Sequence, residues 1–307
     1  RPYQADGFRW MKTLKRCGFC GILADDMGLG KTVITLTAVN DLRFNRFAVR
    51  KVLVIAPKKV AEDTWTRESQ KWDHLKMLRV IPVLGSIKQR IRAINTPGDI
   101  WVLSRDNVSR LVDYYKNDWP FDMVIIDELS SFKSNKAKRF RKLKSVRSHI
   151  HRIVGLTGTP TPNGLEDLWA QIYLLDEGKR LGKTLTGYRD NYFTPGARNG
   201  NVVYEYNPRT WADEEINERI KDICISMKAE DYLELPERID NVRHIKLPDK
   251  AKKQYEELEK TMIADIDGET IDVTSAAALS NKLLQLCNGA VYDADGIYHE
   301  VHDEKIE

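Results

Sequence analysis

The sequence lacks the features that mark secreted, membrane-spanning and low-complexity proteins. Four cysteines among 307 residues are too few for a disulfide scaffold. No apolar run approaches the roughly 18 residues that a membrane span needs, and no signal peptide opens the chain. Internal repeats are absent as well. We therefore expect no membrane association and a cytoplasmic location.

A complete set of metal ligands is also missing. Cys17 and Cys20 form one C-x-x-C pair without the second pair that a zinc site needs, so we interpret them as structural. The composition is 42% hydrophobic and 31% charged with a net charge of +4, which is typical of one large domain or two of ordinary size.

The most informative segment that is present reads DDMGLGKT, from Asp25 to Thr32. Two glycines allow a tight turn whose N–H groups face phosphates, Lys31 can reach the β and γ phosphates, and the Thr32 hydroxyl can hold Mg²⁺. The longer form of this pattern has a glycine at Asp25, so the match is to G-x-G-K-T, and a glycine-rich turn before a helix is the alternative. We predict that the loop binds ATP with Mg²⁺. The predicted nucleotide contacts are Met27, Gly28, Leu29, Gly30, Lys31 and Thr32.

An acidic pair supplies the second half of such a site. The apolar run in FDMVIIDEL ends in Asp127 and Glu128. Alone it could be an exposed strand end, but beside a phosphate loop it indicates catalysis. Asp127 can orient Mg²⁺ through its water shell, and Glu128 can polarise the water that attacks the γ phosphate.

Strand and helix patterns alternate along the first half of the chain, which predicts an α/β fold with a parallel sheet covered by helices on both faces. The expected strands are 20–24, 51–56, 79–84, 100–104, 123–127 and 152–156, and the expected helices are 31–46, 59–72 and 165–175. Trp65 and Trp72 lie seven residues apart, and we interpret both as core residues of the second helix.

The composition changes after Asp176, where a Gly-rich, aromatic stretch begins. It precedes a predicted amphipathic helix with Ile216, Ile220 and Ile223 on one stripe. We interpret this region as a mainly helical insertion, not a second sheet. More helix is expected after Asp249. The predicted division is therefore 1–175, 176–248 and 249–307.

Positive charge is concentrated between Lys133 and Arg152, where nine Lys or Arg residues occur without one Asp or Glu. Such a run is either a solvated helix face or a phosphate-backbone contact. Other polar side chains follow the expected strands and can contact nucleic-acid phosphates without reading bases. The predicted DNA contacts are Lys58, Lys59, Ser104, Arg105 and Lys133.

Taken together, the ordered motifs resemble the Swi/Snf family of superfamily II helicase-like ATPases, specifically the first of its two RecA-like lobes. The similar segments are RPYQADGFRWM, DDMGLGKT, VLVIAPKKVAEDTW, VLSRDN, IIDELSSFKS, GLTGTPTPNGLEDLW, ICISMKAEDYLELPER and NKLLQLCNGAVYD. The resemblance implies a RecA-like P-loop fold in which Gln4 contacts adenine. It also implies that Ser130, Thr157 and Thr159 couple ATP hydrolysis to DNA.

The same resemblance implies a motor that moves along double-stranded DNA, closing on ATP with a second RecA-like lobe that supplies arginine fingers. The chain starts at Arg1 and stops at Glu307 before any second sheet, so we expect a trimmed, nearly inactive fragment and a monomer. Leu129 and Ser130 stand where the family usually has a small residue and histidine. The compact insertion favours a prokaryotic or phage-encoded protein. An RNA-directed helicase and a catalytically silent nucleic-acid clamp remain the alternatives.

Overall fold

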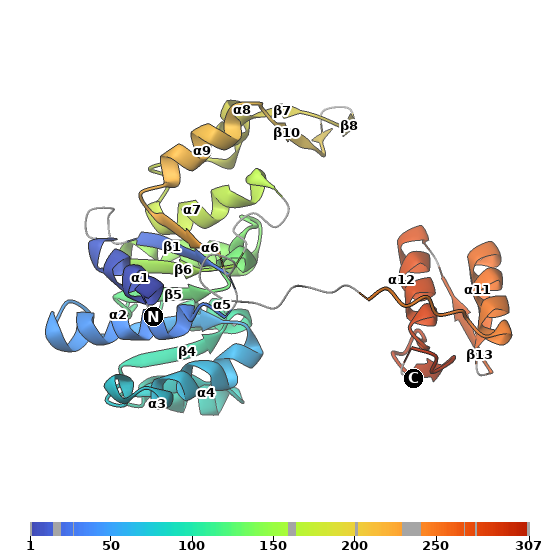
Figure 1. Ribbon diagram of the computed structural model, residues 1–307, viewed down its shortest axis with the longest axis horizontal. Coiled ribbons are helices and arrows are strands. Elements are labelled where there is room, and N and C mark those ends of the chain that lie inside the picture. Colours follow the sequence, from blue (N-terminus) through green and yellow to red (C-terminus); the bar gives the residue numbers. More distant parts are fainter. Residues whose placement is uncertain are drawn as a thin grey trace. The chain divides into compact units, whose positions relative to one another are not determined.

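The computed structural model describes residues 2–14, 20–26, 28–158, 164–199, 202–228, 241–266, 268–273 and 275–305. The chain forms two compact units, Arg1–Leu235 and Pro236–Glu307 (Figure 1). Each unit buries apolar side chains of its own. None of the helices within the described ranges is long and apolar enough to cross a membrane.

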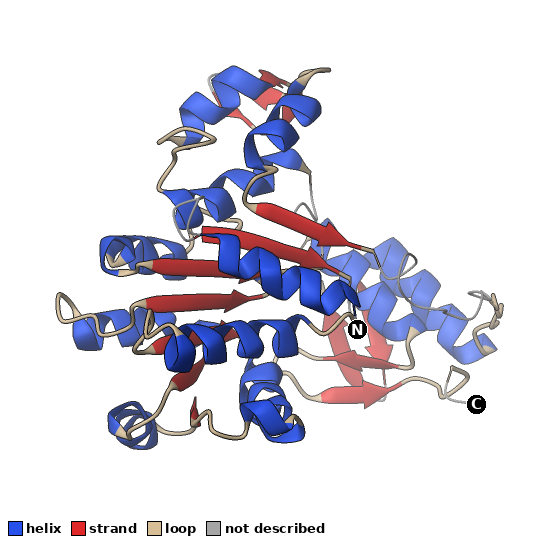
Figure 2. Ribbon diagram, turned by 60° about the vertical axis from the view of Figure 1, so that its left-hand side comes forward, coloured by secondary structure: helices blue, strands red, loops and turns tan. Residues whose placement is uncertain are grey.

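A parallel sheet of seven strands forms the centre of the first unit, in the order β11-β1-β6-β5-β2-β4-β3 (Figure 2). Its strands are β1 Cys20–Asp25, β2 Val52–Ala56, β3 Val80–Val83, β4 Ile100–Ser104, β5 Met123–Asp127, β6 Arg152–Leu156 and β11 Cys224–Met227. The predicted α/β fold is confirmed. Because all neighbours are parallel, the loops that follow the strands gather at one edge, where such sheets bind ligands.

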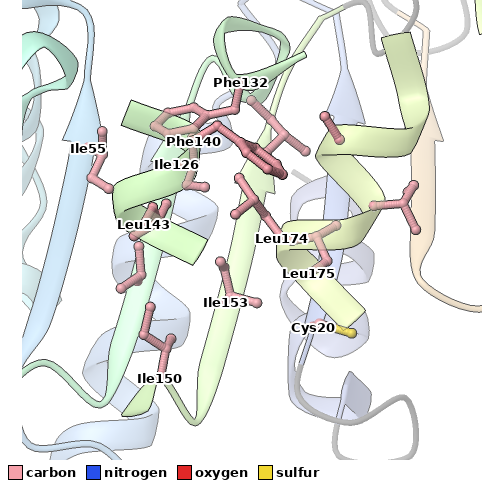
Figure 3. Close-up of a cluster of buried hydrophobic side chains, with 14 of the residues drawn as sticks. Cys20, Ile55, Ile126, Phe132, Phe140, Leu143, Ile150, Ile153, Leu174 and Leu175 are labelled. Atoms are coloured by element: carbon pink, nitrogen blue, oxygen red, sulfur yellow. The ribbon is translucent and has the colours of Figure 1, made fainter. Parts of the chain in front are cut away.

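Helices cover both faces of this sheet, as the alternation of side chains along the strands requires. Ile55 and Ile126 point into the cluster that includes Phe140 and Leu174 (Figure 3), whereas Val54 and its neighbours on the other face pack with the first helices. The helices are α1 Pro2–Thr13, α2 Lys31–Asn40, α3 Trp65–Lys71, α4 Ile87–Asn95, α5 Val108–Tyr115, α6 Lys138–Ser145 and α7 Leu168–Asp176.

Short turns of tighter or wider helix extend several of these elements. The helix predicted over 31–46 is α2 followed by the π-helical turn Asp41–Asn45, and another π-helical turn, Val60–Thr64, leads into α3. The 3₁₀ turns are Asp73–Leu75, Arg105–Asn107, Leu129–Phe132, Arg147–His149 and Leu165–Asp167.

The region after α7 combines helices with two nested antiparallel strand pairs. It contains α8 Leu185–Tyr192, β7 Phe193–Pro195, β8 Arg198–Asn199, β9 Val202–Val203, β10 Tyr206–Pro208 and α9 Ala212–Ile220. Strand β7 pairs with β10, and β8 pairs with β9. Ile216 and Ile220 are buried on α9 as predicted, whereas the equally buried Ile223 lies in the turn after the helix ends. The chain then returns to the first sheet as β11 beside β1, a strand that the sequence patterns do not predict.

In its described residues the second unit contains two helices and two hairpins around a small apolar cluster. Its elements are α11 Asp249–Thr261, β12 Ile263–Ile266, β13 Glu269–Asp272, α12 Ala276–Cys287, β14 Ala290–Tyr292 and β15 Tyr298–Glu300. The helices predicted after Asp249 are confirmed, whereas the hairpins are not foreseen by the helical periodicity.

Candidate active site

The phosphate loop joins the end of β1 to the start of α2. Gly28 and Gly30 both have left-handed backbone conformations, with φ of 85° and 86°, which favour glycine. At Gly30 a Cβ atom would also meet the Gln4 amide nitrogen at 2.6 Å, so a larger residue there would have to displace the end of the Gln4 side chain. Gly30 is the N-cap of α2, whose first N–H groups face the loop and make an anion site. Met27 lies outside the described residues.

Lys31 holds the loop together through its ammonium group. Its Nζ donates to the backbone oxygens of Asp25 at 2.6 Å and Asp26 at 3.0 Å. Burial lowers the pKa of Lys31, and the nearby carboxylates oppose this shift. Thr32 follows in the first turn of α2 and is half-buried. A lysine in this position can exchange carbonyl oxygens for phosphate oxygens without leaving the loop.

Gln4 and Asp25 also belong to the surroundings of the phosphate loop. Gln4, on α1, donates through Nε2 to the Leu29 oxygen at 3.4 Å, which places the predicted adenine contact directly against the loop. Asp25 is fully buried, and within the described residues neither carboxyl oxygen has a hydrogen-bond partner. Burial raises the pKa of Asp25 to about 7. The sequence marks Asp25 only as the position where the longer phosphate-loop pattern has glycine, and it does not indicate a buried carboxyl group there.

Asp127 ends β5 at the same edge of the sheet. Its Oδ2 accepts a hydrogen bond of 2.9 Å from the indole Nε1 of Trp65. Burial raises the pKa of Asp127, and the hydrogen bond from Trp65 is the largest opposing effect. The Thr32 hydroxyl and the Asp127 carboxylate are the oxygen ligands that suit Mg²⁺. Among the described residues no cluster of three or more His, Cys, Asp or Glu side chains offers a different metal site.

Glu128 receives two hydrogen bonds on one oxygen. The hydroxyls of Ser130 and Thr157 both donate to Glu128 Oε1, the latter over 3.2 Å. Glu128 has a left-handed backbone with φ of 65°, and Leu129 packs against Gly155, where a Cβ would meet Leu129 Cδ2 at 2.4 Å. Two of the three predicted coupling residues therefore touch the predicted base. Thr159 lies outside the described residues.

The predicted DNA contacts follow three strands of the sheet but differ in accessibility. Lys58 and Lys59 are exposed after β2, and Lys58 is 4.0 Å from Glu62. Ser104 is buried, and its hydroxyl lies 3.5 Å from Asp106. In this structure the Ser104 side chain is therefore not exposed to a DNA phosphate. Arg105 lines a basic hollow whose other cations are Arg110, Lys138 and Arg139.

The basic run from Lys133 to Arg152 divides into partnered and accessible charges. Lys133 lies 3.4 Å from Asp167, and Lys142 pairs with Asp113. The buried Arg147 donates to backbone oxygens at the end of α7. Lys138 and Arg141 are exposed and have no hydrogen-bond or ion-pair partner within the described residues. The run therefore mixes cations that have partners in the fold with exposed ones, and contact of the exposed cations with nucleic-acid phosphates stays a prediction.

Trp65 and Trp72 have different environments, although their spacing suggests the same one. Trp65 is fully buried, as predicted, but Trp72 is 37% exposed. Helix α3 ends at Lys71 and Trp72 has an extended backbone, so helical spacing no longer applies there. The prediction of a core role is wrong for Trp72, whose indole N–H bonds Glu68 on the surface.

Comparison with known proteins gives concordant matches. The SNF2-related domain family matches residues 3–290. Protein p41 of Acyrthosiphon pisum secondary endosymbiont phage 1 is 36% identical over 314 residues, covering all of this chain and 67% of that protein. The human SWI/SNF-related matrix-associated actin-dependent regulator of chromatin subfamily A member 1 is 34% identical over 57% of this chain and 17% of its own length.

Solved structures agree with the sequence matches. The Sulfolobus solfataricus SWI2/SNF2 ATPase core in complex with dsDNA aligns with a TM-score of 0.61 and 26% identity. The alignment covers 93% of this chain and 57% of the Sulfolobus chain. The chain therefore spans a little over half of that ATPase core and a small share of the human relative.

Proposed function

The chain belongs to the SNF2-related domain family, and from this membership we propose that it is the first lobe of a motor that couples ATP hydrolysis to movement along double-stranded DNA. The observation that carries the proposal is the set of loops at the ends of β1, β6 and β5, which are neighbours in the sheet. These loops carry the phosphate-binding lysine, Thr157 and the acidic pair, the parts that ATP hydrolysis requires.

Each of these residues has a defined task in the proposed reaction. Lys31 exchanges its two carbonyl partners for oxygens of the β and γ phosphates. Thr32 and Asp127 would hold hydrated Mg²⁺, which would supply positive charge beside the transferred phosphate. Glu128 accepts a proton from the attacking water through the oxygen that Ser130 and Thr157 leave available.

DNA is the proposed track. The Sulfolobus relative was solved in complex with dsDNA, and Lys58, Lys59 and Arg105 lie after strands of the same sheet edge that carries the ATP site. Lysine and arginine contacts to phosphates give affinity that varies little with sequence and falls with salt. We place Ser104 behind this surface, where it supports the loop through Asp106.

A second RecA-like lobe completes the proposed catalytic site. The chain spans 57% of the Sulfolobus ATPase core, which supports a further part in the active protein. Arginines supplied across such an interface raise the rate of phosphate transfer by about a thousandfold or more. The chain alone should therefore bind ATP and hydrolyse it slowly, and a version extended through the second lobe should be faster by about that factor. Equal ATPase rates for the chain alone and for the extended version would show that the second lobe contributes nothing to catalysis.

Movement along DNA is tested by displacement of a third strand from a DNA triplex. The complete protein with ATP should release the third strand, and its Glu128→Gln variant should bind the triplex without releasing it. ATP hydrolysis without displacement would remove translocation from the proposal. The match to a phage protein supports a phage or bacterial origin, and we propose a monomer acting in the cytoplasm.

A further inference from the structure

Trp65 is a buried tryptophan whose indole N–H contacts Asp127, the carboxylate proposed to hold Mg²⁺. It begins α3, is fully buried, and donates from Nε1 to Asp127 Oδ2 over 2.9 Å. Buried indole N–H groups usually find a partner, so the contact could simply satisfy the indole. Trp101 argues against that explanation. It is 3% exposed on β4, yet its Nε1 has no partner among the described residues.

The contact restrains Asp127 in a way that suits metal binding. An indole N–H is a donor that cannot itself become a metal ligand. By donating to Oδ2, the indole restricts the rotation of the Asp127 carboxylate at the end of β5. Hydrogen-bonded partners behind a metal-binding group commonly set its orientation, and their loss costs about 10- to 100-fold in metal affinity.

Trp65 also lies at one end of a short, internally bonded segment that starts at the predicted DNA contacts. Lys58 and Lys59 follow β2, the Ala61 N–H donates to the Pro57 oxygen over 2.9 Å, and the π-helical turn then runs into Trp65. Ala61 is buried, which anchors the middle of the segment. Lys58, Lys59 and Trp65 therefore belong to one continuous helical segment, with helical backbone from Lys58 into α3.

We propose that Trp65 is a positioning residue that orients Asp127 for hydrated Mg²⁺ and links the Lys58–Lys59 segment to the ATP site. The inference rests on the proposed function for the identity of both ligands. In this arrangement binding of DNA to the lysines and of Mg²⁺–ATP to the strand end each favour the same position of the indole. Such a coupling is reciprocal: DNA strengthens Mg²⁺ binding, and Mg²⁺–ATP strengthens DNA binding.

The test is a Mg²⁺ titration of a fluorescent ATP analogue bound to the complete protein, with and without saturating duplex DNA. Trp65→Phe removes the N–H and part of the ring, and replacement of Trp65 by 3-benzothienylalanine removes the N–H while keeping the ring shape. Trp101→Phe is the matched control, because it truncates a buried tryptophan whose N–H has no partner in the described part of the chain.

Both Trp65 replacements should raise the Mg²⁺ concentration at half-saturation by about tenfold, with Mg²⁺-free nucleotide affinity unchanged. DNA should lower that concentration in the wild type and in Trp101→Phe but not in the Trp65 replacements. Normal Mg²⁺ binding by the benzothienylalanine protein would overturn the positioning role, and a retained DNA effect would overturn the link. A wild type whose Mg²⁺ affinity does not respond to DNA would also overturn the link, and the positioning role would still be decided by the titration without DNA. Failure of the wild type to bind Mg²⁺–ATP or duplex DNA at all would instead refute the proposed function.

Discussion

The Thr157 hydroxyl donates a hydrogen bond of 3.2 Å to Glu128 Oε1, which joins the loop after β6 to the loop after β5. Ser130 donates to the same oxygen from the next turn of the chain. Because both hydroxyls meet one carboxylate oxygen, a change in either loop alters the position of the proposed base. We propose that these two hydrogen bonds to Glu128 Oε1 couple DNA binding to ATP hydrolysis.

Thr157→Val should therefore lower DNA-stimulated ATP turnover without weakening ATP binding. A hydrogen bond to a charged group contributes about 1.5–3 kcal/mol, which corresponds to a loss of roughly 10- to 100-fold in rate. Steady-state ATPase assays and nucleotide titrations measure the two quantities. Thr37→Val is the control, because it removes hydroxyl contacts to Val33 and His74 and none to Glu128. Weakened ATP binding in the Thr157 variant would show a structural role instead.

Lys31→Ala should weaken ATP binding by about 30-fold or more, since loss of one member of a close charge pair costs about 2 kcal/mol or more. The expected loss arises from the β and γ phosphates, so ADP and AMP should be affected progressively less. Isothermal titration with the three nucleotides measures this order. Equal affinities in the wild type and the variant would refute the assignment of the phosphate site.

Reversal of Lys138 and Arg141 to Glu should reduce the salt dependence of DNA binding. These cations are exposed and without partners in the described part of the chain, whereas Lys142 pairs with Asp113 and would confound the result. Each lost phosphate contact lowers the slope of log affinity against log salt by about one. The double reversal of Lys252 and Lys253, exposed on α11, gives the same change in net charge. An unchanged slope would show that α6 is a solvated face and that the track follows Lys58 and Arg105.

The sequence predicts well what local pattern determines. Strands β4, β5 and β6 have the predicted bounds, because each is a short apolar run followed by polar residues. The phosphate loop is equally local, since its glycines, lysine and threonine are adjacent in the chain. Tertiary partners are a different matter. Trp65 and Asp127 are 62 residues apart, so no spacing rule indicates their hydrogen bond.

Contacts between residues far apart in the sequence also explain why strand β11 and the partners of Lys133 and Lys142 are not predicted. Strand β11 has four residues, and the Ser226 hydroxyl that bonds the Ala24 oxygen lies 202 residues away along the sequence. Only the approach of β1 makes so short a segment a strand. Likewise, Lys133 and Lys142 are counted as free positive charge in the sequence, but carboxylates from other elements partner them in the fold.

Asp25→Asn should stabilise the protein above neutral pH. Because burial raises the pKa of Asp25 to about 7 from 3.8, the native state holds this proton more tightly than the unfolded state. The wild type therefore loses stability as the pH rises from about 4 to about 7, by up to about 4 kcal/mol, and the variant does not share that loss.

Urea unfolding of the wild type and the Asp25→Asn variant at pH 5, 6, 7 and 8 measures this difference. The advantage of the variant should grow with pH and then level off. Asp26→Asn, at the adjacent and less buried position, controls for removal of a carboxylate from the loop. A difference between wild type and Asp25→Asn that stays constant with pH would contradict the buried, protonated state of this carboxyl.

The most direct test of the central claim is the ATPase rate of the complete protein with duplex DNA, single-stranded DNA and duplex RNA at matched concentrations. A duplex-DNA motor predicts strong stimulation by duplex DNA, little dependence on its sequence, and weak stimulation by RNA. Glu128→Gln should bind ATP and DNA while abolishing the stimulated rate. Stimulation by RNA alone would indicate an RNA-directed helicase, and nucleic-acid binding without hydrolysis would indicate a silent clamp; either result would contradict the account.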